Sequence, residues 1–124
     1  MITFRVEDLR ALEISGTDVE LGLLAEDLTD IADGRGAWVA VTGDVAPEYH
    51  QATGFVNTVI FRTTEGPASL VVAANAMVEC CLPLQLLQRV LGAVQRTGGA
   101  IEAPACIQDP GLEIRVICTG QEAA

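Results

Sequence analysis

Hydrophobic residues recur at helical spacing between residues 18 and 33. They return every three or four positions, the spacing that gathers side chains on one face of a helix. Thr17 and Glu20 match a capping box, in which each side chain bonds the other's backbone N–H. Gly34 and Gly36 suit the left-handed conformation that commonly ends a helix. The pattern predicts an amphipathic helix over residues 18–33, whose buried stripe contains Leu21, Leu24, Ala25, Leu28, Ile31 and Ala32.

A second helix is predicted to begin at Pro83 and to end at Gly98 and Gly99. Proline fits the first helical turn because its missing N–H has no partner there. The predicted core stripe is Leu84, Leu87, Val90, Leu91 and Val94. The predicted outer face is Gln85, Gln88, Arg89, Gln95 and Arg96, with Gly92 at its centre.

Alternating apolar and polar positions predict strands around both helices. The first two strands are expected to form a hairpin, and residues 99–110, with two prolines, are expected to be a loop. Residues 69–80 allow two interpretations, because residues 73–82 also have good helix propensity. The strand interpretation is preferred, and it places Asn75 and Glu79 on one face, where they are either exposed to solvent, which is preferred, or line a shallow groove. The predicted strands are residues 2–6, 11–15, 37–42, 56–64, 69–80 and 112–118.

This order of elements predicts an α+β fold. We expect a two-layer sandwich, with a mostly antiparallel sheet and two helices on one face, close to a ferredoxin-like split βαβ with an added N-terminal strand. The length fits a single domain over residues 1–124, with a frayed tail at about 119–124. The other face of the sheet contains Val71 and Met77, so we also expect a homodimer through the sheet.

The charge of the chain is strongly negative and unevenly distributed. The net charge is −10, and residues 1–48 hold eleven acids against three arginines. Such a chain repels phosphate backbones, so the expected partner is a basic protein and no nucleic acid. The longest apolar run is interrupted by Asn75 and Glu79, so no membrane partner is expected. The N-terminus lacks the apolar core of a signal peptide, which predicts a cytoplasmic location.

Much of the negative charge lies on the outer face of the first predicted helix. One interpretation is a solvated face of an acidic protein, the usual role of such charge runs. The other is a binding face for a basic partner. The candidate partner-binding residues are Glu20, Glu26, Asp27, Asp30 and Asp33.

Residues 44–54 are predicted to be a loop that holds the only tyrosine and the only histidine. Glu48, Tyr49 and His50 are therefore the candidates for proton transfer. An enzyme would use His50 with Glu48 or Tyr49, beside a pocket lined by Trp38 and Met77. The absence of lysine excludes a Schiff-base lysine, a pyridoxal phosphate anchor and a P-loop.

No cofactor or metal is expected. The four cysteines form no C-x-x-C pair and accompany a single histidine, so the spacing of a zinc site is absent. Free cysteines are commonly core residues, and reduced, buried thiols are the default interpretation. The cysteines are Cys80, Cys81, Cys106 and Cys118.

The sequence Leu-Glu-Ile-Ser-Gly-Thr-Asp at residues 12–18, followed by the leucine-rich helix and a strand, resembles one known family. It is similar to the core of a small immunity-protein family from bacterial polymorphic toxin systems, over residues 12–41. The resemblance implies a non-catalytic cytoplasmic protein that neutralises a cognate toxin. The sequence departs from the family after Val41, so no functional residue is carried over.

Three functions are therefore weighed. The leading hypothesis is a non-catalytic acidic interaction protein, of which an immunity-type inhibitor of a basic toxin is one form. The alternatives are a small dimeric enzyme with acid–base chemistry in the loop at residues 44–54, and a dimeric ligand-binding or structural module.

Overall fold

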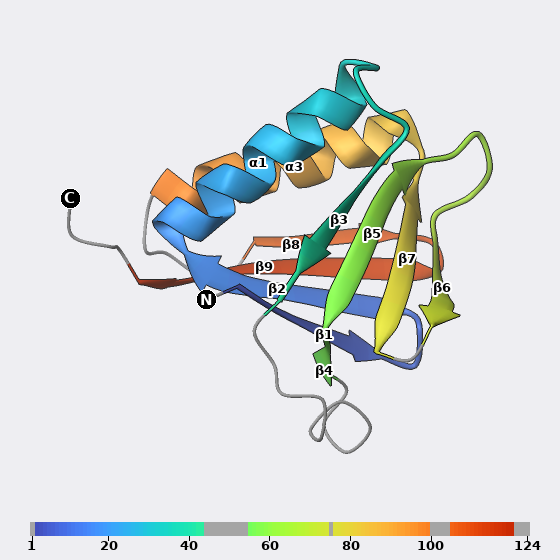
Figure 1. Cartoon of the computed structure of the whole chain (residues 1–124), viewed down its shortest axis with the longest axis horizontal. Helices are drawn as coiled ribbons and strands as arrows, with labels where there is room; N and C mark the ends of the chain where they lie inside the picture. The colour runs from blue at the N-terminus through green and yellow to red at the C-terminus, as the bar shows by residue number, and fades with distance from the viewer. Residues whose placement is uncertain (1, 44–54, 75, 100–104, 121–124) are drawn as a thin grey trace.

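The computed structural model describes residues 2–43, 55–74, 76–99 and 105–120, and these form two helices and nine strands (Figure 1). The helices are α1 (Asp18–Ala32) and α3 (Leu84–Gly99). The strands are β1 (Thr3–Glu7), β2 (Ala11–Thr17), β3 (Trp38–Thr42), β4 (Phe55–Val56), β5 (Thr58–Thr63), β6 (Ser69–Ala74), β7 (Met77–Leu82), β8 (Ala105–Asp109) and β9 (Leu112–Gly120).

The strands form two sheets. Sheet A has the order β4-β1-β2-β9-β8, and sheet B has the order β3-β5-β7-β6. Neighbouring strands are antiparallel except for the pairs β2–β9 and β5–β7, which are parallel. The chain passes from one sheet to the other at Asn57, whose carbonyl accepts from Gly43 N at 2.6 Å and whose N–H donates to Ala76 O at 2.8 Å. A ferredoxin-like domain has a single sheet, so this division into two sheets is the main difference from the sequence expectation.

Both helices lie on the same side of the two sheets (Figure 1). Helix α1 contacts β2 and β9 of sheet A and β3 and β5 of sheet B, while α3 contacts β8 and β9 of sheet A and β7 of sheet B. The two helices also pack against each other. The predicted α+β two-layer sandwich with two helices on one face is confirmed. No helix among the described residues has the length and apolar character needed to span a membrane.

A single hydrophobic core joins both sheets to the helices. Phe4 of sheet A and Phe61 of sheet B meet edge to face, with ring centroids 6.2 Å apart. Each helix contributes leucines that are fully or almost fully buried. The largest fully buried side chains are Phe4, Phe61, Leu12, Ile14, Leu21, Leu24, Leu28, Leu82, Leu87, Ile114, Val59 and Val90.

Helix α1 begins at the predicted capping box. Thr17 Oγ1 accepts from Glu20 N at 3.3 Å, and Glu20 Oε1 accepts from Thr17 N at 2.9 Å. The helix ends at Ala32, and Gly34 then takes a φ of +76°, the left-handed conformation expected after a helix. The predicted buried stripe of this helix is confirmed at Leu21, Leu24, Ala25, Leu28 and Ile31.

The single strand predicted over residues 69–80 is wrong. These residues form the antiparallel hairpin β6–β7, and Ala76 at its turn has a φ of +60°. Strand β7 pairs in parallel with β5, whereas β6 pairs only with β7. The alternation of apolar residues at every second position continues across the turn. The sequence pattern therefore does not show that the chain reverses direction between β6 and β7. Residues 77–82 are strand, as preferred over helix, and Asn75 lies outside the described residues.

Five smaller predictions also need correction. Residues 105–109 form β8 instead of loop, and the predicted strand 56–64 is divided at Asn57. The tail is strand as far as Gly120, because β9 continues beside β2 to Thr17. Helix α3 starts one residue after Pro83, whose carbonyl accepts from Leu87 N at 2.9 Å. Leu84 of its predicted core stripe is 46% exposed, and Leu86 and Ala93 are buried instead.

Candidate partner-binding surface on helix α1

A groove of about 220 Å³ runs between α1 and β3. Its apolar part comes from Ile2, Leu24 and Val41. Glu20 and Asp27 also line the groove, and they share one side of α1 because seven residues make nearly two helical turns. The groove therefore combines an apolar lining with two carboxyl groups. Its lining residues are Ile2, Glu20, Leu23, Leu24, Asp27, Val41 and Thr42.

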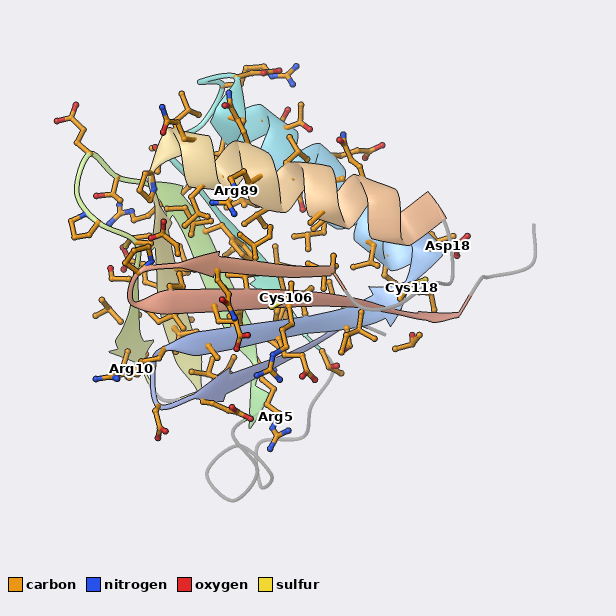
Figure 2. All side chains as sticks on the ribbon, turned by 180° about the vertical axis from the view of Figure 1, so that it is seen from behind. Arg5, Arg10, Asp18, Arg89, Cys106 and Cys118 are labelled. Atoms are coloured by element: carbon orange, nitrogen blue, oxygen red, sulfur yellow. The ribbon has the colours of Figure 1, made fainter. Side chains whose placement is uncertain are left out.

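A second, more open groove lies on the other side of α1, against α3. Asp18 and Glu26 of α1 line it, together with Val94 and Gln95 of α3. Figure 2 shows Asp18 at the N-terminal end of α1, close to β2. Carboxyl groups thus border α1 on both sides.

The ridge of α1 between the two grooves is partly apolar. Leu23 is 57% exposed, Val19 is also exposed, and they lie one helical turn apart. Gly22 lies beside this ridge, at the groove against α3, and a Cβ atom added there would meet nothing within 4 Å. The sequence analysis missed these residues because it assigned only acidic residues to the outer face. We define the α1 surface as Val19, Glu20, Gly22, Leu23, Glu26 and Asp27.

The structure divides the five predicted partner-binding acids into two groups. Glu20, Glu26 and Asp27 lie on the α1 surface, although Glu20 also serves the capping box. Asp30 and Asp33 share Arg35, whose Nη2 lies 2.8 Å from Asp30 Oδ1 and 3.2 Å from Asp33 Oδ2. Arg35 therefore offsets part of the negative charge at the C-terminal end of the helix.

Asp27 is the carboxyl group whose ionised form is disfavoured at this surface. Partial burial raises the pKa of Asp27, and the negative charges of Asp30 and Glu26 raise it further. A cation placed in the groove would act in the opposite direction, since a positive charge nearby favours the carboxylate. The groove therefore suits a positively charged group with an apolar stem.

The predicted catalytic candidates Glu48, Tyr49 and His50 lie outside the described residues. Among the described residues, Trp38 and Met77 do not lie together at one site. Trp38 aligns with Arg62 and Cys81, whereas Met77 aligns with Thr58 and Thr42, at the other end of sheet B. Four strand positions separate the two levels, or about 13 Å along the strand direction. The enzyme hypothesis therefore stays a prediction.

Only one of the four cysteines is buried. Cys80 is fully enclosed, and burial raises the pKa of its thiol. Cys106 is exposed on β8 (Figure 2) and donates to Glu113 Oε1 at 3.2 Å, which raises its pKa as well. Both thiols are held in the protonated, weakly nucleophilic form. Across the described ranges, no three histidine, cysteine, aspartate or glutamate side chains gather closely enough to hold a metal ion.

Comparison of the sequence with known protein-family models and with curated proteins gives no match in either case. The resemblance of residues 12–41 to an immunity-protein family therefore stays a prediction.

Proposed function

We propose that this protein is a non-catalytic interaction protein that binds a basic partner protein through the α1 surface. One observation carries the proposal: the exposed apolar residues Val19 and Leu23 lie beside the carboxyl groups of Glu26 and Asp27. An interface gains affinity from apolar burial and specificity from charge complementarity.

The partner chemistry follows from the groove between α1 and β3. An arginine or lysine side chain has an apolar stem and a charged head. The stem would contact Leu23 and Val41, and the head would approach Asp27. Gly22 leaves space for the partner's backbone to approach the ridge closely.

The resemblance of residues 12–41 supports one specific form of this proposal, an immunity-type inhibitor that neutralises a basic toxin. The same resemblance implies a cytoplasmic location, which is part of the proposal. The fold does not require Asp30, because it lies near the negative end of the helix dipole, where a carboxylate opposes helix formation.

The test compares two charge reversals that change the net charge equally. Tagged wild-type protein, Asp27→Lys and Asp33→Lys are used to capture proteins from a lysate of the source organism at low salt and at about 0.5 M NaCl, where exposed charges are screened. We expect a basic protein to bind wild type and Asp33→Lys at low salt only. Asp27→Lys should weaken the affinity for that purified protein by on the order of tenfold or more.

Leu23→Ala provides a second, uncharged variant. It should weaken binding at low salt without changing how the affinity depends on salt, since it removes apolar contact and no charge. Equal losses for Asp27→Lys and Asp33→Lys would mean that only net charge matters, and this would refute the assigned surface. Capture of no basic protein by wild type would refute the function itself.

A further inference from the structure

The outer edge of sheet B at β6 is open. Strand β6 is the last strand of the order β3-β5-β7-β6, and within the described part of the chain it pairs only with β7. Figure 1 shows no helix or strand beyond it, among the described residues, at that margin of the sheet. An edge strand presents unpaired backbone N–H and C=O groups along its free side, which can pair with another strand.

Strand β6 lacks the features with which proteins usually block such an edge. Its sequence, Ser-Leu-Val-Val-Ala-Ala, contains no charged residue and no proline. Val71 is 50% exposed, and Val72, Ala73 and Ala74 are exposed as well. An exposed apolar edge strand without charges favours association through β pairing.

The other edges differ in this respect. Strand β4 has only two residues, and β8 lies against α3 and ends at Asp109. Strand β3 lies beside α1, and the adjoining groove carries Glu20 and Asp27. A second copy approaching β3 would bring its own acidic groove against this one, and the like charges would repel.

Charge does not oppose a second copy at β6. The described residues 38–43, 55–74 and 76–82 carry Arg62, Glu65 and Glu79, a net charge of −1, and Arg62 forms an ion pair with Glu79. Residues 18–36 hold six acids and one arginine, a net charge of −5. Two copies of this acidic chain therefore meet with little repulsion at sheet B. The open face of sheet B is less suitable than its edge, because a face contact would bury the exposed ion pair at a desolvation cost.

We propose that the protein forms a two-fold symmetric homodimer in which β6 of one protomer pairs antiparallel with β6 of its partner. The two copies of sheet B then form one continuous eight-stranded sheet. This proposal is independent of the function assigned to the α1 surface.

The alternation of side chains restricts the register of this pairing. Opposite residues of a β pair point to the same face, so the two-fold axis must relate positions that share a face. The β6–β7 pairing is irregular between Val72 and Ala74. Pairing centred on Val71 uses the regular part of the strand, with Val71 opposite Val71 and Leu70 opposite Val72. Directly opposite Cβ atoms lie about 5 Å apart, so the valines of the two protomers would be in contact.

The first experiment measures molecular mass by sedimentation equilibrium from about 1 µM to about 100 µM, the range of affinity expected for a modest interface. Wild type should approach twice the chain mass of 13.0 kDa. Val71→Lys places two ammonium groups opposite each other and should raise the dissociation constant on the order of hundredfold. Leu84→Lys is the matched control, since Leu84 of α3 is 46% exposed, and this variant should remain dimeric.

A second variant tests the register without disturbing the fold. Val71→Cys, treated with oxidised glutathione, should form a disulfide-linked dimer, because the two thiols are oxidised across the two-fold axis. Ala40→Cys, exposed on β3 at the opposite edge, should link no more than wild type does. A wild-type protein that is monomeric at about 100 µM would overturn the proposal. The edge of β6 would then be available for pairing with a strand of another protein. The proposal would also be overturned by a dimer that Val71→Lys leaves intact, or by equal cross-linking of the two cysteine variants.

Discussion

Helices α1 and α3 pack against each other and against the same two sheets, but their outer sides carry opposite charge. Helix α1 holds five acidic residues and no basic one, whereas α3 holds two arginines and no acidic residue. Arg89 lies on the exposed side of α3 (Figure 2). Both inner sides are built from leucine, isoleucine, valine and alanine. The inner sides of both helices thus pack in the same core, whereas their outer sides differ in charge.

This difference separates what the fold requires from what it leaves free. The inner sides must fill a shared core at high density, so their residues are restricted in both helices. The outer sides contribute little to folding, because exposed charges change stability by a few tenths of a kcal/mol each. Folding therefore places few restrictions on the outer sides, and the two helices can differ there without a large change in stability.

The largest expected loss of stability comes from buried leucines on the inner sides of the two helices, and it tests whether both sides contribute equally to the core. Leu28 of α1 and Leu87 of α3 are both almost completely buried. Leu28→Ala and Leu87→Ala should each lower the free energy of unfolding by about 2–5 kcal/mol, since each removes apolar contacts and leaves a cavity. Urea denaturation measures both losses. Leu23→Ala, at an exposed position of α1, should cost less than about 0.5 kcal/mol. A small loss for either buried leucine would contradict the shared core.

The same division explains how much the sequence revealed. Helix α1, its capping box and the β1–β2 hairpin depend on neighbours in sequence, and all were predicted. The division into two sheets depends on pairings between distant segments, such as β2 with β9, and no local pattern encodes these. The β6–β7 turn was missed because alternation continued through it.

The candidate site shows a similar limit. The sequence identified the acids of α1 but not their unequal surroundings, because only the fold brings Val41 beside Asp27 and turns Arg35 toward Asp30. The exposure of Leu23 likewise depends on how α1 sits on the sheets. The candidates in residues 44–54 lie outside the described residues, so the enzyme hypothesis gains no support from the fold.

Substitutions at the N-terminal ends of the two helices should change the free energy of unfolding by a smaller amount. Helix α1 has a complete capping box, whereas α3 follows Pro83 and has no acidic residue in its first turn. Thr17→Ala should lower the free energy of unfolding by about 1 kcal/mol, because Glu20 N loses its acceptor. Leu84→Ala, at the exposed first position of α3, should change it less. Thermal unfolding of the two variants gives this difference, and an equal change would argue that the cap does not stabilise α1.

The capping box also predicts a pH dependence. Burial acts to raise the pKa of Glu20, but hydrogen bonds, the largest from the Thr17 backbone, outweigh burial and lower it. A carboxyl group with a lowered pKa stabilises the folded state at neutral pH, and this stability is lost as pH falls through the folded pKa. Glu20→Gln should therefore destabilise the protein at pH 7 and have less effect at about pH 3, below the ordinary glutamate pKa. A loss that is independent of pH would contradict this assignment.

The smallest expected change in stability concerns Asp27. Its dependence on pH has the opposite sign from that of Glu20. Burial, followed by the charges of Asp30 and Glu26, raises the pKa of Asp27 in the folded state. Stability associated with this group is therefore present below the ordinary aspartate pKa and is lost as pH rises through the folded pKa. Asp27→Asn should stabilise the protein by about 0.3 kcal/mol at pH 7, because it relieves repulsion between like charges on one helix. The gain should vanish at about pH 3, where aspartate is protonated.

Asp18→Asn is the matched control for Asp27→Asn. Asp18 lies in the first turn of α1, where a carboxylate interacts favourably with the helix dipole, so this variant should lose stability at pH 7. Chemical denaturation at pH 7 and at about pH 3 distinguishes the two signs. If Asp27→Asn stabilises the free protein but weakens capture of the basic partner, Asp27 is retained at a cost to folding. That result would identify the acidic side of α1 as a surface kept for binding, in contrast to α3, and a destabilising Asp27→Asn would remove this distinction between the helices.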